Sequence, residues 1–220
     1  ISIFLILSIF NFAYHSILKL SSDYSNKAYN SLGFYNYIKE IDKEKSLEAL
    51  NDSEFKFSKA IKLNPFDKTF YPYYLANVYY YKGIELKDNS YNIKSIKILN
   101  DIFDYSQYPN SIYNLIGDNY YILNDVEKAK EYYKKSIEWY KFFNEPILSL
   151  TKIYLEENNL NEAEKYVDII LSVKENPVAY RYKGIIYLKK DNIDAAKKYL
   201  QRAIELGDKE SEEIIKNLND

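Results

Sequence analysis

The sequence predicts an all-α protein built as a helical-repeat array. A tyrosine recurs at a nearly constant interval, because Tyr120, Tyr154 and Tyr187 are separated by 154 − 120 = 34 and 187 − 154 = 33 residues. A polar turn follows each tyrosine after four residues, an alanine follows after nine, and amphipathic segments flank each turn. A fixed period of this length with helix–turn–helix content is typical of stacked repeats, so we expect an elongated right-handed superhelical α-solenoid.

The first twenty residues differ from the rest of the chain. The segment 1–20, ISIFLILSIFNFAYHSILKL, is apolar around the whole helix circumference as far as Asn11. A membrane helix needs about 20 mainly apolar residues, and Tyr14, His15 and Lys19 suit an interfacial end. This pattern favours a membrane anchor, while a truncated signal-peptide core and a helix packed on the repeats stay open as alternatives. The chain begins with Ile, from which we expect a fragment or a processed form of a longer product.

Five helical hairpins are expected between residues 22 and 218, in units of approximately 26–65, 69–108, 110–143, 144–176 and 177–208, with a cap at 209–218. The second unit exceeds the period by about seven residues, so its turn must bulge or its helices must lengthen. Asn159 and Glu162 form a capping box, and Gly207 is placed to end the last repeat helix. The charged segment 209–218 would give the array the polar outer face that a terminal repeat needs.

The residues at fixed offsets resemble the tetratricopeptide-repeat family, whose pattern is a large residue, Leu-Gly, Tyr, Ala, an aromatic and a late Pro. In the third unit the matching residues are Tyr113, Ile116, Gly117, Tyr120, Ala129 and Tyr133. In the fifth they are Tyr180, Gly184, Tyr187, Ala196, Leu200 and Ala203, and the fourth matches less well, with Ile147, Leu150, Thr151, Tyr154, Ala163 and Val167. In the first unit, Leu32-Gly33 stands where the close-packed pair belongs. We expect all of these residues to be core.

The resemblance implies that the first helix of each unit lines a concave face that binds a protein or a peptide. Aligned to the pattern, the groove-facing candidates are Tyr73, Asn77, Tyr80, Asn114, Asp118, Tyr121, Lys152, Arg181 and Ile185. Aromatic rings would supply contact area, and amides would hold a peptide backbone. The simpler alternative is that several of these residues are only wetted surface. The chain holds 26 tyrosines, which reflect either an AT-rich coding sequence or a functional aromatic surface.

The composition argues against catalysis, metal binding and nucleic-acid binding. Lys plus Arg (30) nearly balances Asp plus Glu (32), whereas a nucleic-acid surface needs a clustered basic excess. There is no cysteine, His15 is the single histidine, and the five glycines are scattered, so no nucleophile–base pair, thiolate site or phosphate loop is visible. We therefore expect no catalytic residue, no metal and no small-molecule cofactor in this chain.

Two functions fit these features. The first is a membrane-tethered adaptor, anchored through residues 1–20, whose repeats recruit a protein or a peptide. The second rests on the order of segments, an apolar run followed by FSKAIKLNPFDKTFYPYYLANVYY, which resembles the C-terminal tail of bacterial O-antigen ligase or polymerase-like membrane proteins. That resemblance implies glycan transfer by catalytic residues upstream of Ile1 and repeats on the extracytoplasmic side of the membrane.

Overall fold

The computed structural model describes the backbone of residues 3–218 and the side chains from residue 10 onward. Within this range the chain forms eleven α-helices and one 3-10 turn, and it contains no β-strand. The chain divides into two compact units, Ile1–Asp125 and Val126–Asp220. The all-helical prediction is therefore confirmed for the described part of the chain.

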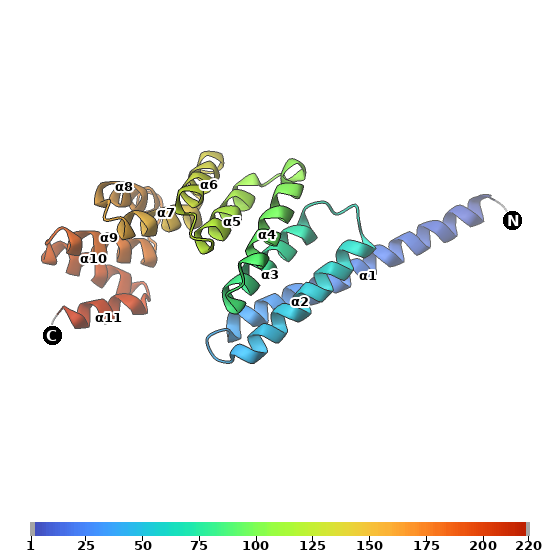
Figure 1. Cartoon of the computed structure of the whole chain (residues 1–220), viewed down its shortest axis with the longest axis horizontal. Coiled ribbons are helices and arrows are strands. Elements are labelled where there is room, and N and C mark those ends of the chain that lie inside the picture. Colours follow the sequence, from blue (N-terminus) through green and yellow to red (C-terminus); the bar gives the residue numbers. More distant parts are fainter. Residues whose placement is uncertain (1–2, 219–220) are drawn as a thin grey trace. The chain divides into compact units, whose positions relative to one another are not determined.

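The helices follow one another as antiparallel hairpins within each unit (Figure 1). The first unit contains α1 (Ile3–Ile38), α2 (Lys43–Leu63), α3 (Phe70–Leu86), α4 (Asn89–Ile102), η1 (Phe103–Tyr105) and α5 (Pro109–Ile122). The second contains α6 (Val126–Trp139), α7 (Asn144–Glu156), α8 (Leu160–Leu171), α9 (Pro177–Lys189), α10 (Ile193–Glu205) and α11 (Lys209–Asn217).

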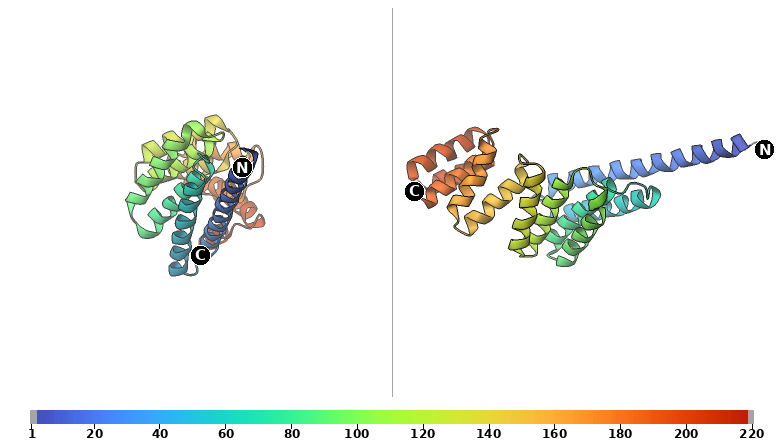
Figure 2. Two further views of the ribbon diagram at one scale, coloured as in Figure 1. Left: turned by 90° about the vertical axis from the view of Figure 1, so that its right-hand side faces the viewer. Right: turned by 90° about the horizontal axis from the view of Figure 1, so that it is seen from above.

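Helix α1 is continuous, although the sequence predicts a separate apolar helix before a first repeat helix. Its C-terminal half lies antiparallel to α2, where the Ser21 Oγ donates to the Ala60 carbonyl (2.9 Å) and the Ser53 Oγ donates to the Ala28 carbonyl (3.1 Å). Its N-terminal half extends beyond the end of α2 (Figure 2). There Phe10 and Phe12 are 70% and 76% exposed. The two predicted helices merge because no proline or glycine interrupts the chain between Ile3 and Leu32.

The predicted membrane span is not supported by the described residues. Residues 1–2, and the side chains of residues 3–9, lie outside what the structure describes. Over the described part, no helix combines the length and the apolar character that crossing a membrane requires. The second half of the apolar run is interrupted by the polar residues Asn11, His15, Ser16 and Lys19.

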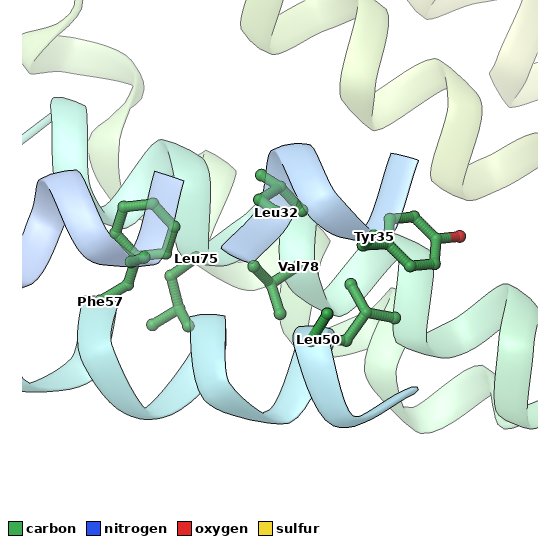
Figure 3. Packing of buried hydrophobic residues seen from close by; sticks show 8 residues of the cluster. Leu32, Tyr35, Leu50, Phe57, Leu75 and Val78 are labelled. Carbon is green, nitrogen blue, oxygen red and sulfur yellow. The ribbon is translucent and has the colours of Figure 1, made fainter. Parts of the chain in front are cut away.

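The core of the first unit is built from three helices. Leu32 and Tyr35 of α1, Leu50 and Phe57 of α2, and Leu75 and Val78 of α3 pack together (Figure 3). Phe57, Leu50 and Val78 are fully buried. The Tyr35 hydroxyl donates to Glu85 of α3 (2.9 Å), so this buried ring also has its polar atom satisfied.

The polar turns share one geometry, which explains the repeated Asn and Asp residues. Asn124, Asn158 and Asp191 all adopt the left-handed conformation, with φ of 62°, 56° and 58°. In each case the next backbone N–H donates to the tyrosine carbonyl five residues earlier, at 2.9, 2.8 and 2.9 Å. This is the Schellman ending of a helix, and Asn and Asp tolerate its positive φ better than most residues do.

The surplus residues of the second repeat are distributed over two places. Helix α3 has 17 residues, whereas α5 has 14 and α7 and α9 have 13 each, and its left-handed residue is Lys87 (φ 52°). After α4, η1 and residues 106–108 supply a longer connection to α5. The helix therefore lengthens as one of the two predicted solutions expects, whereas the turn between α3 and α4 does not bulge, since only Lys87 and Asp88 form it, and the other extra residues lie after α4.

Several predicted core residues are buried, and several are only partly so. Ile116, Ile147, Leu150, Leu200 and the four alanines of the pattern are fully or almost fully buried. In contrast, Tyr113, Tyr120, Tyr180 and Tyr187 are half-buried. Gly33 is exposed, and nothing lies within 4 Å of a Cβ built on it, so the expected close-packed pair at Leu32-Gly33 is wrong. In this first hairpin Leu32 provides the buried contact alone.

Candidate functional site

Five of the predicted groove residues gather on neighbouring helices of the first unit, on a surface that we call the α3–α5 face. Tyr73, Asn77 and Tyr80 of α3 lie at i, i+4 and i+7, and Asn114 and Asp118 of α5 lie at i and i+4, so each set shares one side of its helix. The Asn77 Nδ2 donates to the Tyr73 carbonyl (3.0 Å), and the Asn114 Nδ2 donates to the Asp118 Oδ2 (3.2 Å). All five side chains are half-buried.

The Asp118 carboxylate acts electrostatically on the tyrosines of α3. Burial raises the pKa of Tyr80, and the negative charge of Asp118 raises it further. Burial and then Asp118 likewise raise the pKa of Tyr81. A nearby negative charge disfavours the phenolate, so these tyrosines stay neutral hydrogen-bond donors at physiological pH. The two helices are thus close enough to act as one surface.

A pocket of about 420 Å³ opens at the N-terminal end of this face. Its wall consists of the start of α3, the end of α4 with η1 and residues 106–108, and the start of α5. Five aromatic rings line it, those of Phe70, Tyr73, Tyr74, Tyr105 and Tyr108. Thr69, Ser106, Gln107 and Ser111 add hydroxyl and amide groups. Ile102 and Ile112 complete the lining, and none of these described residues is charged.

The aromatic rings of the pocket are fixed by contacts with one another. The Phe70 and Tyr74 rings meet edge to face with centroids 4.8 Å apart, and the Tyr73 and Tyr74 rings meet in the same way at 5.5 Å. Tyr74 also stacks on Phe57 of the core (5.8 Å). Such pairs contribute about 0.5–1.5 kcal/mol each beyond area burial, so the wall is anchored to the core.

Sequence reasoning located Tyr73 but missed most of this pocket. Tyr74, Tyr105 and Tyr108 were not among the binding candidates, because the repeat alignment assigns groove positions only to one side of each first helix. Ser111 occupies a groove position of that alignment, yet it was not among the nine predicted groove residues. The available signal was the surplus length of the second unit, since η1 and residues 106–108 come from it.

The predicted residues of the second unit have different surroundings. The Arg181 Nη1 donates to both carboxylate oxygens of Asp208, at 3.1 and 2.8 Å, and it also pairs with Glu210 (3.0 Å). Arg181 and Asp208 are buried, so this pair joins α9 to the start of α11. Lys152 is exposed and lies 3.8 Å from Glu156, and Ile185 is half-buried. Tyr121, at the end of the first unit, is also half-buried.

A second, more open hollow of about 510 Å³ lies between α1 and α2. There the Ser31 hydroxyl donates to Asp52, and the Lys56 Nζ donates to Asp52 and to the Ser31 Oγ (3.4 Å). The charges of this cluster pair with one another, and the contacts hold α1 against α2. Among the residues the structure describes, no three His, Asp or Glu side chains are placed to hold a metal ion.

Comparison with known proteins agrees with the geometry of the hairpins. The profile of the tetratricopeptide repeat matches residues 111–142 and 183–206. One curated relative, the uncharacterized protein ycf37 of Porphyra purpurea, is 32% identical over 76 residues. That match covers 34% of this chain and 44% of the relative, so the chain matches less than half the length of that relative.

Several solved structures share the fold at low sequence identity. A thermophilic TPR protein from Thermus thermophilus has a TM-score of 0.60 and 16% identity, covering 87% of this chain and 97% of its own. The type IV pilus biogenesis factor PilW has a TM-score of 0.58 and 14% identity, with 86% and 98% covered. YrrB, a TPR protein with an unusual peptide-binding site, has a TM-score of 0.56 and 18% identity, with 85% and 90% covered. These comparisons give no support to an origin as an O-antigen ligase tail.

Three observations indicate the same kind of repeat. They are the left-handed Asn and Asp turns, the buried alanines and the two profile matches. Segments 111–142 and 183–206 are tetratricopeptide repeats, and the chain has the α-solenoid fold of tetratricopeptide-repeat proteins.

Proposed function

We propose that this chain is a scaffold that binds a protein or a peptide on its α3–α5 face. The observation that carries the proposal is the convergence of Tyr73, Tyr80 and Asp118 from two helices beside an uncharged aromatic pocket. Rigid aromatic side chains give large contact area at low entropic cost, and Asn77 and Asn114 add amide groups. The structural neighbour YrrB, described as carrying a peptide-binding site, supports this kind of ligand.

A scaffold role also agrees with the chemistry of the described residues. Several carboxylates of α2, of α8 and at the N-cap of α11 pair with lysine or arginine side chains, as in Lys82 with Glu54 (2.6 Å), Lys183 with Glu164 (3.0 Å) and Arg181 with Asp208 (2.8 Å). Such pairs hold successive helices together and leave these groups engaged in structure. We therefore infer a non-catalytic role for this chain.

Site-specific photo-crosslinking tests the binding face. A photoreactive phenylalanine analogue placed at Tyr80 should form one discrete adduct in cells of the source organism, whereas the same analogue at Ile93, 60% exposed on α4, should form none. An excess of unmodified chain should compete for the adduct, and an excess of the Asp118→Lys chain should compete poorly. Equal labelling at the two positions would contradict a binding role for this face.

We also propose that the N-terminal half of α1 tethers the chain to a membrane. The segment 1–20 is largely apolar in sequence, the described side chains Phe10 and Phe12 are exposed beyond the end of α2, and Ile17 and Leu20 are exposed near that end. Transfer of the apolar side chains of a projecting helix from water into a lipid environment lowers their free energy.

Vesicle flotation tests the tether. The whole chain should float with phosphatidylcholine vesicles, and a chain carrying Phe10→Asp, Phe12→Asp and Ile17→Asp should stay at the bottom of the gradient. A control chain with Phe55→Asp and Ile93→Asp, which replaces exposed apolar residues of α2 and α4, should float as the unchanged chain does. Sedimentation of the unchanged chain without the vesicles would exclude the tether.

A further inference from the structure

The surplus length of the second repeat forms one wall of the pocket. Only Lys87 and Asp88 connect α3 to α4. A connection as short as this one after α4 could not form a pocket wall beside the start of α5. Instead η1 and residues 106–108 bring Tyr105, Ser106 and Tyr108 opposite Tyr73 and Tyr74. The pocket thus exists because of residues that the repeat itself does not require.

The lining determines which side chain the pocket accepts. Its rings and isoleucines offer apolar contact, and its hydroxyl and amide groups offer hydrogen bonds without charge. A charged side chain entering it would lose its water without finding an opposite charge, which is costly. A volume of about 420 Å³ lies in the range of small-ligand pockets and accommodates one large side chain. The geometry therefore selects an aromatic or a large aliphatic residue.

The opposite end of the α3–α5 face has different chemistry. Tyr80 follows Tyr73 by seven residues on α3, and Asp118 follows Ser111 by seven residues on α5. Because a helix rises about 1.5 Å per residue, the carboxylate lies about 10 Å from the pocket along the helix direction. An extended peptide covers that distance in about three residues, since each residue spans about 3.3 Å.

We propose that the α3–α5 face recognises a short extended peptide segment in which a large aromatic or aliphatic residue enters the pocket and a lysine or an arginine, about three residues away, meets Asp118. The proposal rests on the function proposed above and specifies its ligand. The apolar residue supplies the buried anchor, and the basic residue fixes the register of the peptide through a charge-assisted hydrogen bond. The uncharged pocket and Asp118 therefore each recognise one residue of the same peptide.

A random dodecapeptide library displayed on phage and panned against the whole chain tests this specificity. The expected result is enrichment of peptides that pair an aromatic or large aliphatic residue with Lys or Arg at a separation of three residues. Binding of an enriched peptide, synthesised with a fluorescent label, should weaken as salt concentration rises, because the contact with Asp118 is electrostatic.

Two variants separate the two contacts. Asp118→Lys should remove the preference for a basic residue and weaken binding of the labelled peptide about tenfold or more, the usual size for loss of a charged hydrogen bond. Ser111→Trp fills the pocket and should remove the preference for a large apolar residue. Matched controls are Asp101→Lys and Ser90→Trp, both at exposed positions of α4, and neither should change the enriched pattern. Circular dichroism spectra must be the same for all four variants and the unchanged chain.

The outcomes distinguish the two levels of the proposal. If no peptide is enriched above an unrelated helical protein, both the binding function and this specificity are overturned. If peptides are enriched and Ser111→Trp or Asp118→Lys abolishes their binding, but they lack the paired pattern, the binding function stands and this specificity fails. Enrichment of acidic peptides would also overturn the specificity, because they would be repelled by Asp118.

Discussion

At the scale of single residues, the conformation of one turn position explains a recurring spacing within this chain. Asn124, Asn158 and Asp191 follow their tyrosines by four residues and all have positive φ. At each of the three positions the backbone ends a helix in the same way. The residue after each turn begins or caps the next helix. Asn159 and Asn192, for example, accept from the Glu162 and Ala195 N–H groups, at 3.4 and 3.1 Å.

Two glycines of the first unit should respond to alanine in opposite directions. A Cβ on Gly83 would stand 2.1 Å from the Asn92 Oδ1, and Asn92 is fully buried and donates to Asn119 (3.1 Å). Gly83→Ala should therefore lower the free energy of unfolding by about 1–3 kcal/mol through overpacking. Gly33 lies inside α1 with open space around it. Gly33→Ala should therefore raise the free energy of unfolding by about 0.5–1 kcal/mol.

Urea unfolding followed by circular dichroism measures both changes. Each variant serves as the control for the other, because both exchange glycine for alanine in a helix of the same unit. Equal shifts of the two midpoints would show that helix propensity, and not the contact with Asn92, decides the effect.

Glu164 should make the stability of the second unit depend on pH. Hydrogen bonding from Lys190 lowers the pKa of Glu164, burial opposes that change, and Lys183 lowers the pKa further. Because the folded pKa lies below the ordinary value of 4.5, the stabilisation is present above about pH 4.5 and is lost as the pH falls through the folded pKa. The carboxylate is partly exposed, so its contribution at neutral pH is about 1 kcal/mol or less.

Glu164→Gln should therefore be less stable than the unchanged chain at pH 7, and the difference should shrink towards zero near pH 3. Urea unfolding at pH 7, 4.5 and 3 measures this difference. Glu212→Gln, which changes an exposed carboxylate of α11, should show no such trend. A constant difference between Glu164→Gln and the unchanged chain at all three pH values would argue against the ionic contribution.

At the scale of elements, the last helix depends on one buried ion pair. Asp208 accepts from Arg181 of α9 and, as the N-cap of α11, accepts from the Ser211 N–H (2.9 Å). The Asp208 carboxylate thus caps the start of α11 and also joins α11 to α9. The sequence placed Arg181 among the groove candidates because it lies on a first helix. Its partner follows 27 residues later, a distance that no helical period predicts.

Removing the arginine should release α11. Arg181→Met leaves Asp208 buried without its cation, which costs about 3–5 kcal/mol in comparable pairs. Hydrogen exchange should then become faster at the amides of α11 before it does so in α7 and α8. The control Arg202→Met breaks exposed contacts with Glu175 and Glu205, and such pairs contribute only about 0–1 kcal/mol. Equal protection of α11 in both variants would contradict this docking role.

At the scale of the whole molecule, the chain consists of two compact units. In Val126–Asp220 the side chains of Ile147, Leu150, Val167, Ile186 and Leu200 are buried. Repeat arrays are stabilised by contacts between neighbouring hairpins, so a run of several hairpins with its own core can fold without the rest.

The fragment 126–220 should therefore fold alone. Its far-ultraviolet circular dichroism should be helical, and its thermal unfolding should be cooperative. A fragment 144–220, which lacks α6, serves as a comparison and should melt at a lower temperature, because α7 then loses its contact with α6. A gradual loss of signal without a transition in fragment 126–220 would show that it depends on the first unit.

The features that could be predicted from the sequence alone are those that local interactions fix. The period of 34 and 33 residues, the Asn and Asp turns and the Gly207 helix ending, at φ 90°, each involve residues within one hairpin. Of the predicted capping box, the Asn159 N-cap is formed, but the Asn159 N–H donates to the Tyr154 carbonyl and not to Glu162. Chain direction, backbone conformation and amphipathic spacing are enough to specify them. The hairpins and the all-helical class could therefore be predicted.

Packing between helices, in contrast, assigns the side chains of this regular pattern to core, surface or pocket. Tyr133 is 2% exposed and Tyr120 is half-buried, although both fit the repeat pattern. Gly33 lies in open space, whereas Gly83 packs on Asn92. The pocket between Tyr73 and Tyr108 required residues of α3, α4, η1 and α5 to meet. These outcomes depend on contacts between helices distant in sequence and on the path of residues 103–108, and neither follows from a period.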